Sequence, residues 1–462
     1  MANLEAPNLK LQPVSVTRKM AASLPGLREL AQKKGLKIHH LGAGYPHPEV
    51  TDPRDFLAHQ ARYFQHLEEL EGLNDESQLP EHLRESFSYT DTLGPVTTRT
   101  AFAEVYGNDW GVAIDPAKLL PTVGATGGIN LICSMCERPG LPVAYLTDAP
   151  TYAGFTARAG LCQHAKIYSI DMDEEGALPD QLRSQIQKAR ADGYFVPFYY
   201  TVPDGHNPAG FSFSNQRREA LLQIAREEGI LIVEDAPYVY INYAKPEDRP
   251  KPFFAMDPKQ TIHLFTGSKI GFPGPRVGFF YSEATLTVAD GQEVSLTEMA
   301  LTESSSDLLF QNPGALRGFE ALLHDDEFKL LDSMWPLAEK KLVVYRENRE
   351  IMLSILEREL GHFPEHFGWT HPGAGFFTVF SFKSGVKTDD AFIESLVADH
   401  GLVVIPMYDF YPQDAKERNP NAGLDQLRLS FCFSESIGDE RRRDLTEAVE
   451  AFCVAAKAAA GV

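Results

Sequence analysis

The middle of the chain alternates between short apolar runs and helix-like segments, and no other feature restricts the fold as strongly. Strand-like runs are predicted at residues 142–146, 167–170, 194–202, 230–233, 262–265 and 277–281, and helices at residues 129–136, 178–191 and 214–228. This alternation predicts a mainly parallel sheet with helices on both faces. In such a sheet, ligands bind beyond the carboxyl ends of the strands.

Polar and glycine-rich clusters occur at these strand ends. They are residues 122–129 (TVGATGGI), 147–152 (TDAPTY), 203–210 (PDGHNPAG), 234–238 (EDAPY) and 266–269 (TGSK). Taken singly, each cluster is ambiguous, since Asp235 could be a helix cap, Asn207 a turn residue, and Tyr152 or Tyr238 a core aromatic. Their common placement predicts that they form one site.

Two cations lie between the last two predicted strands. Lys269 follows the hydroxyl residues Thr266 and Ser268, and Arg276 follows the turn at Pro273-Gly274. Cations flanked by glycine, proline and hydroxyl groups suit an anion site better than a core, although a surface lysine near a turn is the simpler alternative. A lysine that is desolvated or faces another cation becomes a nucleophile for carbonyl groups, and arginine can grip phosphate with two hydrogen bonds.

Three further segments contain candidate binding residues. The turn at residues 124–128 opens a helix, and the N–H groups there could hold a phosphate, although such turns also occur as plain caps. Gly44 lies in a glycine-rich stretch after a short predicted strand, where it could allow a ligand to approach or simply form a turn. Arg428 alternates with apolar residues on a predicted strand, where it could equally point to solvent.

Together these clusters resemble the fold-type-I pyridoxal-phosphate aminotransferases over most of the chain. The family's lysine motif is matched by residues 266–269 (TGSK) and 273–278 (PGPRVG). Residues 199–210 (YYTVPDGHNPAG) and 232–238 (IVEDAPY) most closely resemble the branch that contains 2-aminoadipate, kynurenine and aromatic amino acid aminotransferases. The resemblance implies an α/β fold, with a mainly parallel seven-stranded sheet sandwiched by helices in a large domain (residues 51–335). A smaller α+β domain would combine residues 1–50 and 336–462.

The resemblance also implies a role for each candidate residue. Lys269 would bind pyridoxal 5′-phosphate covalently, Asp235 would pair with its ring nitrogen, and Arg428, with Gly44 nearby, would hold the substrate carboxylate. The remaining cofactor contacts would come from Asn207 and Tyr238 at the phenolic oxygen, Tyr152 on the ring, and Ala125, Thr126, Thr266, Ser268 and Arg276 at the phosphate. Tyr89 would reach the phosphate of a neighbouring subunit, which implies a homodimer with shared active sites.

The implied reaction is amino-group transfer from an L-amino acid, with an aromatic or long side chain favoured, to a 2-oxo acid. The same cofactor could instead support elimination, replacement, cyclisation or oxidation in a specialised biosynthesis. The phosphate turn, which is less polar than usual in the family, and the acidic, helix-like residues 54–88 mildly favour this alternative. A regulatory module that keeps an aminotransferase-like domain is a third possibility.

Composition excludes several other functions. The net charge of −21 disfavours nucleic acid and anionic membranes as partners, and no run of about 18 apolar residues predicts a membrane span. The first 20 residues lack the apolar core of a secretory signal. Five sparse cysteines, including Cys133 and Cys136 in an apolar helical pattern, predict core packing in a reducing cytoplasm and no metal site.

Overall fold

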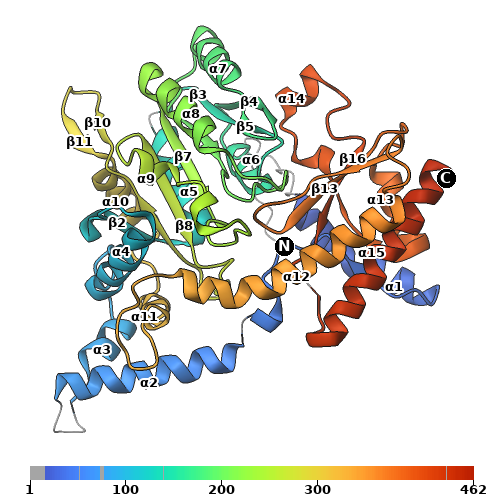
Figure 1. Cartoon of the computed structure of the whole chain (residues 1–462). Helices are drawn as coiled ribbons and strands as arrows, with labels where there is room; N and C mark the ends of the chain where they lie inside the picture. Colours follow the sequence, from blue (N-terminus) through green and yellow to red (C-terminus); the bar gives the residue numbers. More distant parts are fainter. Residues whose placement is uncertain (1–15, 51, 73–77, 139, 433) are drawn as a thin grey trace, which may run out of the picture.

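The computed structural model describes residues 16–50, 52–72, 78–138, 140–432 and 434–462. A sheet of eight strands forms its centre, in the order β2-β9-β8-β7-β6-β3-β4-β5 (Figure 1). The strands are β2 (Leu119–Val123), β3 (Val143–Ala149), β4 (Ala165–Asp173), β5 (Gly176–Ala177), β6 (Phe198–Thr201), β7 (Leu231–Ala236), β8 (Thr261–Thr266) and β9 (Val277–Tyr281).

The predicted mainly parallel α/β sheet is confirmed. Strands β4, β3, β6, β7 and β8 pair in parallel, whereas β9 pairs antiparallel with both β2 and β8, and β5 pairs antiparallel with β4. The sheet has eight strands instead of the expected seven because the two-residue β5 pairs with the far end of β4. A strand this short carries too few residues for an apolar pattern to reveal it.

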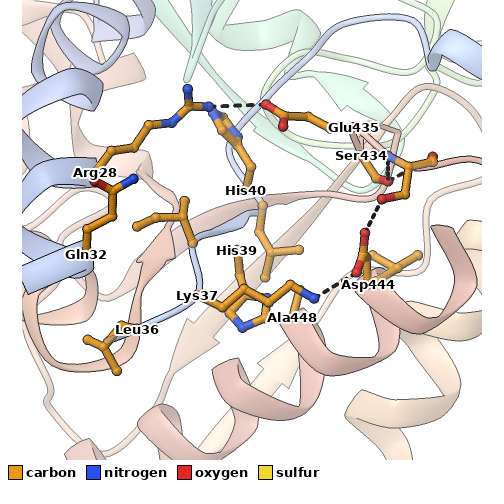
Figure 2. Close-up of a pocket in the computed structure, with 14 residues that line it drawn as sticks. Arg28, Gln32, Leu36, Lys37, His39, His40, Ser434, Glu435, Asp444 and Ala448 are labelled. Carbon is orange, nitrogen blue, oxygen red and sulfur yellow. Dashed lines mark hydrogen bonds and ion pairs between the residues drawn. The ribbon is translucent and has the colours of Figure 1, made fainter. Parts of the chain in front are cut away.

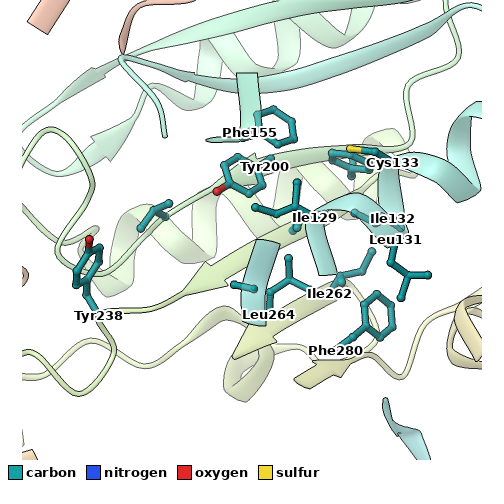
Figure 3. Close-up of a cluster of buried hydrophobic side chains, with 14 of the residues drawn as sticks. Ile129, Leu131, Ile132, Cys133, Phe155, Tyr200, Tyr238, Ile262, Leu264 and Phe280 are labelled. Atoms are coloured by element: carbon teal, nitrogen blue, oxygen red, sulfur yellow. The ribbon is translucent and has the colours of Figure 1, made fainter. Parts of the chain in front are cut away.

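Side chains that alternate along the strands divide the core into two faces. On β6, Phe198 and Tyr200 pack on one face, and Tyr199 packs on the other. The first face contacts α5 (Gly124–Glu137) and α6 (Ala153–Ala159). The second contacts α4 (Val96–Trp110), α7 (Pro179–Ala191), α8 (Asn215–Glu228) and α11 (Pro313–Leu322). Figure 3 shows the first face, where the ring of Tyr200 lies near Ile129 of α5.

A second, antiparallel sheet is built from the C-terminal part of the chain. Its order is β12-β13-β16-β15, and the strands are β12 (Phe367–Trp369), β13 (Phe377–Phe382), β15 (Ile405–Pro406) and β16 (Gln426–Ser430). Helices α13 (Asp390–His400) and α15 (Gly438–Ala460) share its apolar core. Strand β1 (His39–His40) pairs in parallel with β14 (Leu402–Val403), so an N-terminal segment is attached to the C-terminal part of the chain.

One long helix connects the two sheets (Figure 1). The start of α12 (Trp335–Leu360) packs with β8 and β9 through Ala338, and its end packs with the second sheet through Leu356. The proposed domain limits at residues 50 and 335 stay a prediction.

The cavity in Figure 2 lies between α1 (Val16–Lys33), β1 and α15. Its charged groups are already engaged with one another, since Arg28 pairs with Glu435 at 3.3 Å and Lys37 with Asp444 at 2.7 Å. This cavity is therefore a weak candidate for a charged ligand.

The acidic segment that was expected to be helical, residues 54–88, contains two helices. Gly72, in the left-handed conformation, ends α2 (Pro53–Glu71), and Pro80 precedes α3 (Glu81–Phe87). Residues 73–77 of this segment lie outside the described ranges, as do residues 1–15.

The remaining elements are η1 (Pro48–Val50), η2 (Pro116–Lys118), η3 (Pro246–Asp248), α9 (Phe253–Met256), β10 (Thr285–Thr287), β11 (Glu293–Ser295), α10 (Leu296–Asp307), η4 (Met407–Phe410) and α14 (Gln413–Arg418). Within the part of the chain that the structure describes, no helix combines the length and apolarity needed to cross a membrane.

Candidate active site

The carboxyl ends of neighbouring strands bring the predicted polar clusters to one pocket. Because β3, β6, β7 and β8 are adjacent and parallel, the segments that follow them emerge at the same edge of the sheet. The pocket is lined by Ala125, Thr126, Tyr152, Val202, Asn207, Asp235, Pro237, Tyr238, Thr266, Ser268, Lys269 and Arg276. All the predicted site residues except Arg428, Gly44 and Tyr89 are therefore lining residues of this pocket.

Lys269 projects its amine toward the N-terminal segment of the chain. Its Nζ donates a 2.6 Å hydrogen bond to the backbone oxygen of Gly44, so the two predicted residues lie together. Burial lowers the pKa of Lys269 to about 8, and the nearby cations Arg428 and Arg276 act in the same direction. A lysine of this kind has a substantial unprotonated, nucleophilic fraction near neutral pH.

Asp235, on β7, has a buried carboxyl group, and only one of its two oxygens has a hydrogen-bond partner among the described residues. Its Oδ2 accepts a 2.7 Å hydrogen bond from the hydroxyl of Tyr200, whereas Oδ1 is buried and has no partner among the described residues. Burial raises the pKa of Asp235 to about 7. A buried carboxylate oxygen without a donor is costly, so the pocket favours a cationic or N–H group at this position.

An anion seat lies at the start of α5. Arg276 donates to Ser268 Oγ at 2.9 Å, and Thr266 Oγ1 lies 2.9 Å from the same oxygen. A Cβ at Gly124 would collide with the Arg276 guanidinium, so the turn can approach it only as glycine. Arg276 itself has a φ of 60°, a left-handed conformation that is uncommon for a residue with a side chain and occurs preferentially at functional sites.

Arg428, on β16, is 1% exposed and belongs to the second sheet. Its guanidinium donates to Asn207 Oδ1 at 2.6 Å and to Gly42 O at 2.8 Å. The rings of Phe377 and Phe410 lie 4.0 Å and 4.9 Å from its central carbon. Burial lowers the pKa of Arg428 to about 10, and no carboxylate within the described ranges forms an ion pair with it. The sequence left open whether this arginine points to solvent, and the structure directs it inward.

Two tyrosines form apolar walls of the pocket. The ring of Tyr238 lies 5.9 Å from Lys269 Nζ, and Tyr152 precedes α6. Burial raises the pKa of both hydroxyls, with Asp235 acting in the same direction on Tyr152. Both phenols therefore stay protonated and can donate hydrogen bonds at physiological pH.

Tyr89 lies outside this pocket. Its side chain is 89% exposed and packs edge-on against Phe310 at 5.9 Å. Its predicted contact with the phosphate of another subunit stays a prediction.

Sequence reasoning missed several groups that complete the site. Tyr200 was predicted only as a strand residue, yet it supplies the hydrogen bond to Asp235. Phe410 packs on Arg428, and Cys432 donates to Ala43 O at 3.3 Å beside the Lys269 acceptor. The partner of Tyr200 across the sheet depends on strand register, which no local pattern revealed. Across the described ranges, no cluster of His, Cys, Asp and Glu side chains could hold a metal ion.

The sequence and the fold both match known aminotransferases. The family model "Aminotransferase class I and II" matches residues 73–431. The (S)-3,5-dihydroxyphenylglycine transaminase of Amycolatopsis orientalis is 28% identical over 91% of this chain and 89% of its own length. The aromatic-amino-acid aminotransferase 1 of Thermococcus litoralis is 27% identical, with coverage of 96% and 94%.

Among solved structures, the kynurenine aminotransferase of Pyrococcus horikoshii has a TM-score of 0.74 at 21% identity and covers 96% of this chain and 95% of its own. The likeness to this structure concerns the fold alone. The match of the family model over most of the chain, on a site with a desolvated lysine, a buried aspartate and an anion seat, confirms the predicted resemblance: the chain belongs to the class I and II aminotransferases, which are pyridoxal-phosphate-dependent enzymes.

Proposed function

We propose that this aminotransferase takes its amino group from an L-amino acid with an aromatic or other long side chain. Arg428 is the observation that carries the proposal, because a buried guanidinium without a carboxylate partner suits the α-carboxylate of an amino acid or a 2-oxo acid. The rings of Phe377 and Phe410 on either side offer apolar surface for the substrate. The names of the two relatives above, which act on aromatic amino acids, support the same choice.

The pocket fits pyridoxal phosphate at both of its charged ends. Asp235 Oδ1, buried without a donor, suits a protonated ring nitrogen, and Arg276 hydrogen-bonds only neutral oxygens in the described part of the chain, so it suits a phosphate. We infer that Asn207 and Tyr238 would hold the phenolic oxygen and that Tyr152 would lie on the ring. The phosphate would bind Ala125, Thr126, Thr266, Ser268 and Arg276.

The chemistry that the cofactor supplies when bound is withdrawal of electrons from the α-carbon of the amino acid. Lys269 Nζ would remove the proton from the α-carbon of the amino acid and return it to the cofactor carbon that receives the amino group. Arg428 would hold the carboxylate in place during this proton transfer. Asp235, as a carboxylate, would keep the ring nitrogen protonated and the ring electron-withdrawing.

We further propose a homodimer that works in the cytoplasm. Tyr89 lies in a stretch of exposed apolar residues with Phe87 and Val96, which are 86% and 63% exposed. A second copy of the chain that covers this stretch would bring Tyr89 to the partner's phosphate seat. The five cysteines are all free, which supports a reducing compartment.

A half-reaction without any acceptor tests the proposed reaction. Holoenzyme is mixed with single L-amino acids, and the absorption of the lysine-linked cofactor is followed as it converts to its amino form. We expect tyrosine, phenylalanine or 2-aminoadipate to convert the cofactor at concentrations where alanine and aspartate do not. Ammonia release with return of the original band would contradict transamination and indicate an elimination reaction. Conversion by aspartate alone would overturn the proposed substrate class.

A further inference from the structure

A second cavity lies behind the loop that carries Lys269 and Arg276. It has a volume of about 820 Å³ and is lined by loop residues 271–275 and by parts of α2 and α12. The walls are mostly apolar, with Phe56, Leu57, Phe272 and Leu337 among them. It shares no lining residue with the pocket of Lys269. The two cavities are therefore separate, although residues of the loop between β8 and β9 line both of them.

Lys341, on α12, is a half-buried cation at this cavity. Its Nζ donates to the backbone oxygen of Ile270, and this is its only acceptor among the described residues. Burial is the sole cause that lowers its pKa, to about 8, so the ammonium form still predominates at pH 7. An ammonium group carries three donors. Two donors of Lys341 therefore have no protein acceptor within the described ranges and can bind a ligand in the cavity.

Four aspartates line the cavity: Asp55 is exposed to solvent, and the other three already have partners. Asp52 pairs with Arg54 at 2.6 Å, and Asp326 pairs with Arg62 at 3.0 Å. Asp325 accepts hydrogen bonds from the backbone N–H groups of Glu327 and Lys329. In the described part of the chain no acid lies within ion-pair distance of Lys341, so its charge is available to an anionic ligand.

We propose that this cavity binds a small carboxylate with an apolar body. The carboxylate would accept hydrogen bonds from Lys341, and the body would pack against Phe56, Phe272 and Leu337. Such a ligand would contact the loop that joins Lys269 to Arg276, because Ile270, the acceptor of Lys341, directly follows Lys269. The cavity would thus be a second carboxylate site beside that of Arg428, and this assignment does not depend on which amino acid the enzyme uses.

Calorimetric titration of the holoenzyme with 3-phenylpropionate tests the proposal, because this carboxylate has neither an amine nor a 2-oxo group and cannot react. We expect two binding events per subunit. Lys341→Met should weaken one of them about tenfold or more, the effect expected for the loss of a charged hydrogen bond. Arg428→Leu should remove the other, and Lys340→Met, a neighbouring lysine at the same cavity, should change neither. A single event that only Arg428→Leu removes would overturn the proposal.

A measurement on the unaltered protein covers the case in which Lys341→Met does not fold. Acetylation of Lys341 by acetic anhydride is followed by mass spectrometry with and without 3-phenylpropionate. We expect the carboxylate to slow acetylation about tenfold, whereas 3-phenylpropanol, which lacks the charge, should not. Equal protection by both compounds would overturn the role of the carboxylate. A Lys341 that never reacts would mean that another part of the assembly covers the cavity, and this too would overturn the proposal.

Discussion

The guanidinium of Arg428 donates a 2.6 Å hydrogen bond to the side-chain oxygen of Asn207. Arg428 belongs to the second sheet and Asn207 follows β6 of the large sheet, so this bond joins the two parts of the molecule inside the site. Because we assign Arg428 to the substrate carboxylate and Asn207 to the cofactor, the same contact would hold substrate and cofactor in register.

Replacing Arg428 by lysine should weaken substrate binding and leave cofactor binding intact. Lysine keeps the charge but cannot form the planar two-point contact with a carboxylate, so KM for the amino donor should rise about 10- to 100-fold. The absorption of the bound cofactor should be unchanged. Arg358→Lys, on an exposed part of α12, provides the control. An unchanged KM would contradict the assignment of Arg428.

Replacing Lys269 by alanine should abolish both covalent cofactor binding and proton transfer. General acid–base groups contribute about 10²- to 10⁴-fold, so the half-reaction should slow by at least about 10³-fold. Borohydride treatment followed by mass spectrometry should attach the cofactor to the unaltered protein but not to the variant. Lys340→Ala, an exposed lysine, should retain attachment and rate. Attachment that survives Lys269→Ala would point to a different lysine.

The pH dependence of cofactor capture should report the lowered pKa of Lys269. Only the unprotonated amine attacks a carbonyl, and burial lowers the pKa of Lys269 to about 8. The rate of covalent capture by cofactor-free protein should therefore rise about tenfold per pH unit below pH 8 and level off above it. Stopped-flow absorption measures this directly. A rate that still rises beyond pH 9.5 would indicate an exposed amine.

Asp235 should make the cofactor-free protein less stable as the pH rises from 4 to 7. Its pKa is raised from the ordinary 3.8 to about 7 by burial, so the folded state binds a proton that the unfolded chain has lost. Stability therefore falls with rising pH across this window, and the contribution is lost once the pH passes the folded pKa. Asp235→Asn should lack this component. Urea unfolding at pH 5 and pH 7 tests it, and equal pH dependence in both proteins would refute it.

Mixing two inactive variants tests whether Tyr89 acts across subunits. Lys269→Ala and Tyr89→Ala subunits should each have little activity alone. In a hybrid dimer, one site would combine the intact Lys269 of one subunit with the intact Tyr89 of the other. Activity should therefore return when the two variants are unfolded and refolded together. If Tyr89 served its own subunit, both sites of the hybrid would stay damaged and no activity would return.

Local sequence patterns were sufficient to predict most strands of the large sheet and most residues that line the pocket. Apolar runs predicted β3, β4, β6, β7, β8 and β9, and the helix predicted at residues 214–228 corresponds to α8. The clusters at the strand ends included Lys269, Asp235 and Asn207, and they were expected to form one site because parallel strands place their carboxyl ends at one edge of the sheet. Residues 54–88 were expected to be helical, but no pattern revealed that the left-handed Gly72 ends α2 within this segment.

The contacts that set the chemistry came only from the tertiary structure. Tyr200 meets Asp235 because β6 and β7 pair in a particular register, and Lys269 meets Gly44 because the N-terminal segment, which pairs with β14 and β16, reaches the pocket. The inward direction of Arg428 depends on where the second sheet lies against the first. The periodicity of a segment specifies which face of a helix or strand is buried. The hydrogen-bond partners of its side chains can come from distant segments, as for Lys269 and Gly44, which are more than 200 residues apart. Burial of Lys269 and Asp235 lowers the pKa of the first and raises the pKa of the second. The residue types in the sequence were therefore enough to predict a site. The protonation states of its side chains depend on the burial that the tertiary structure creates.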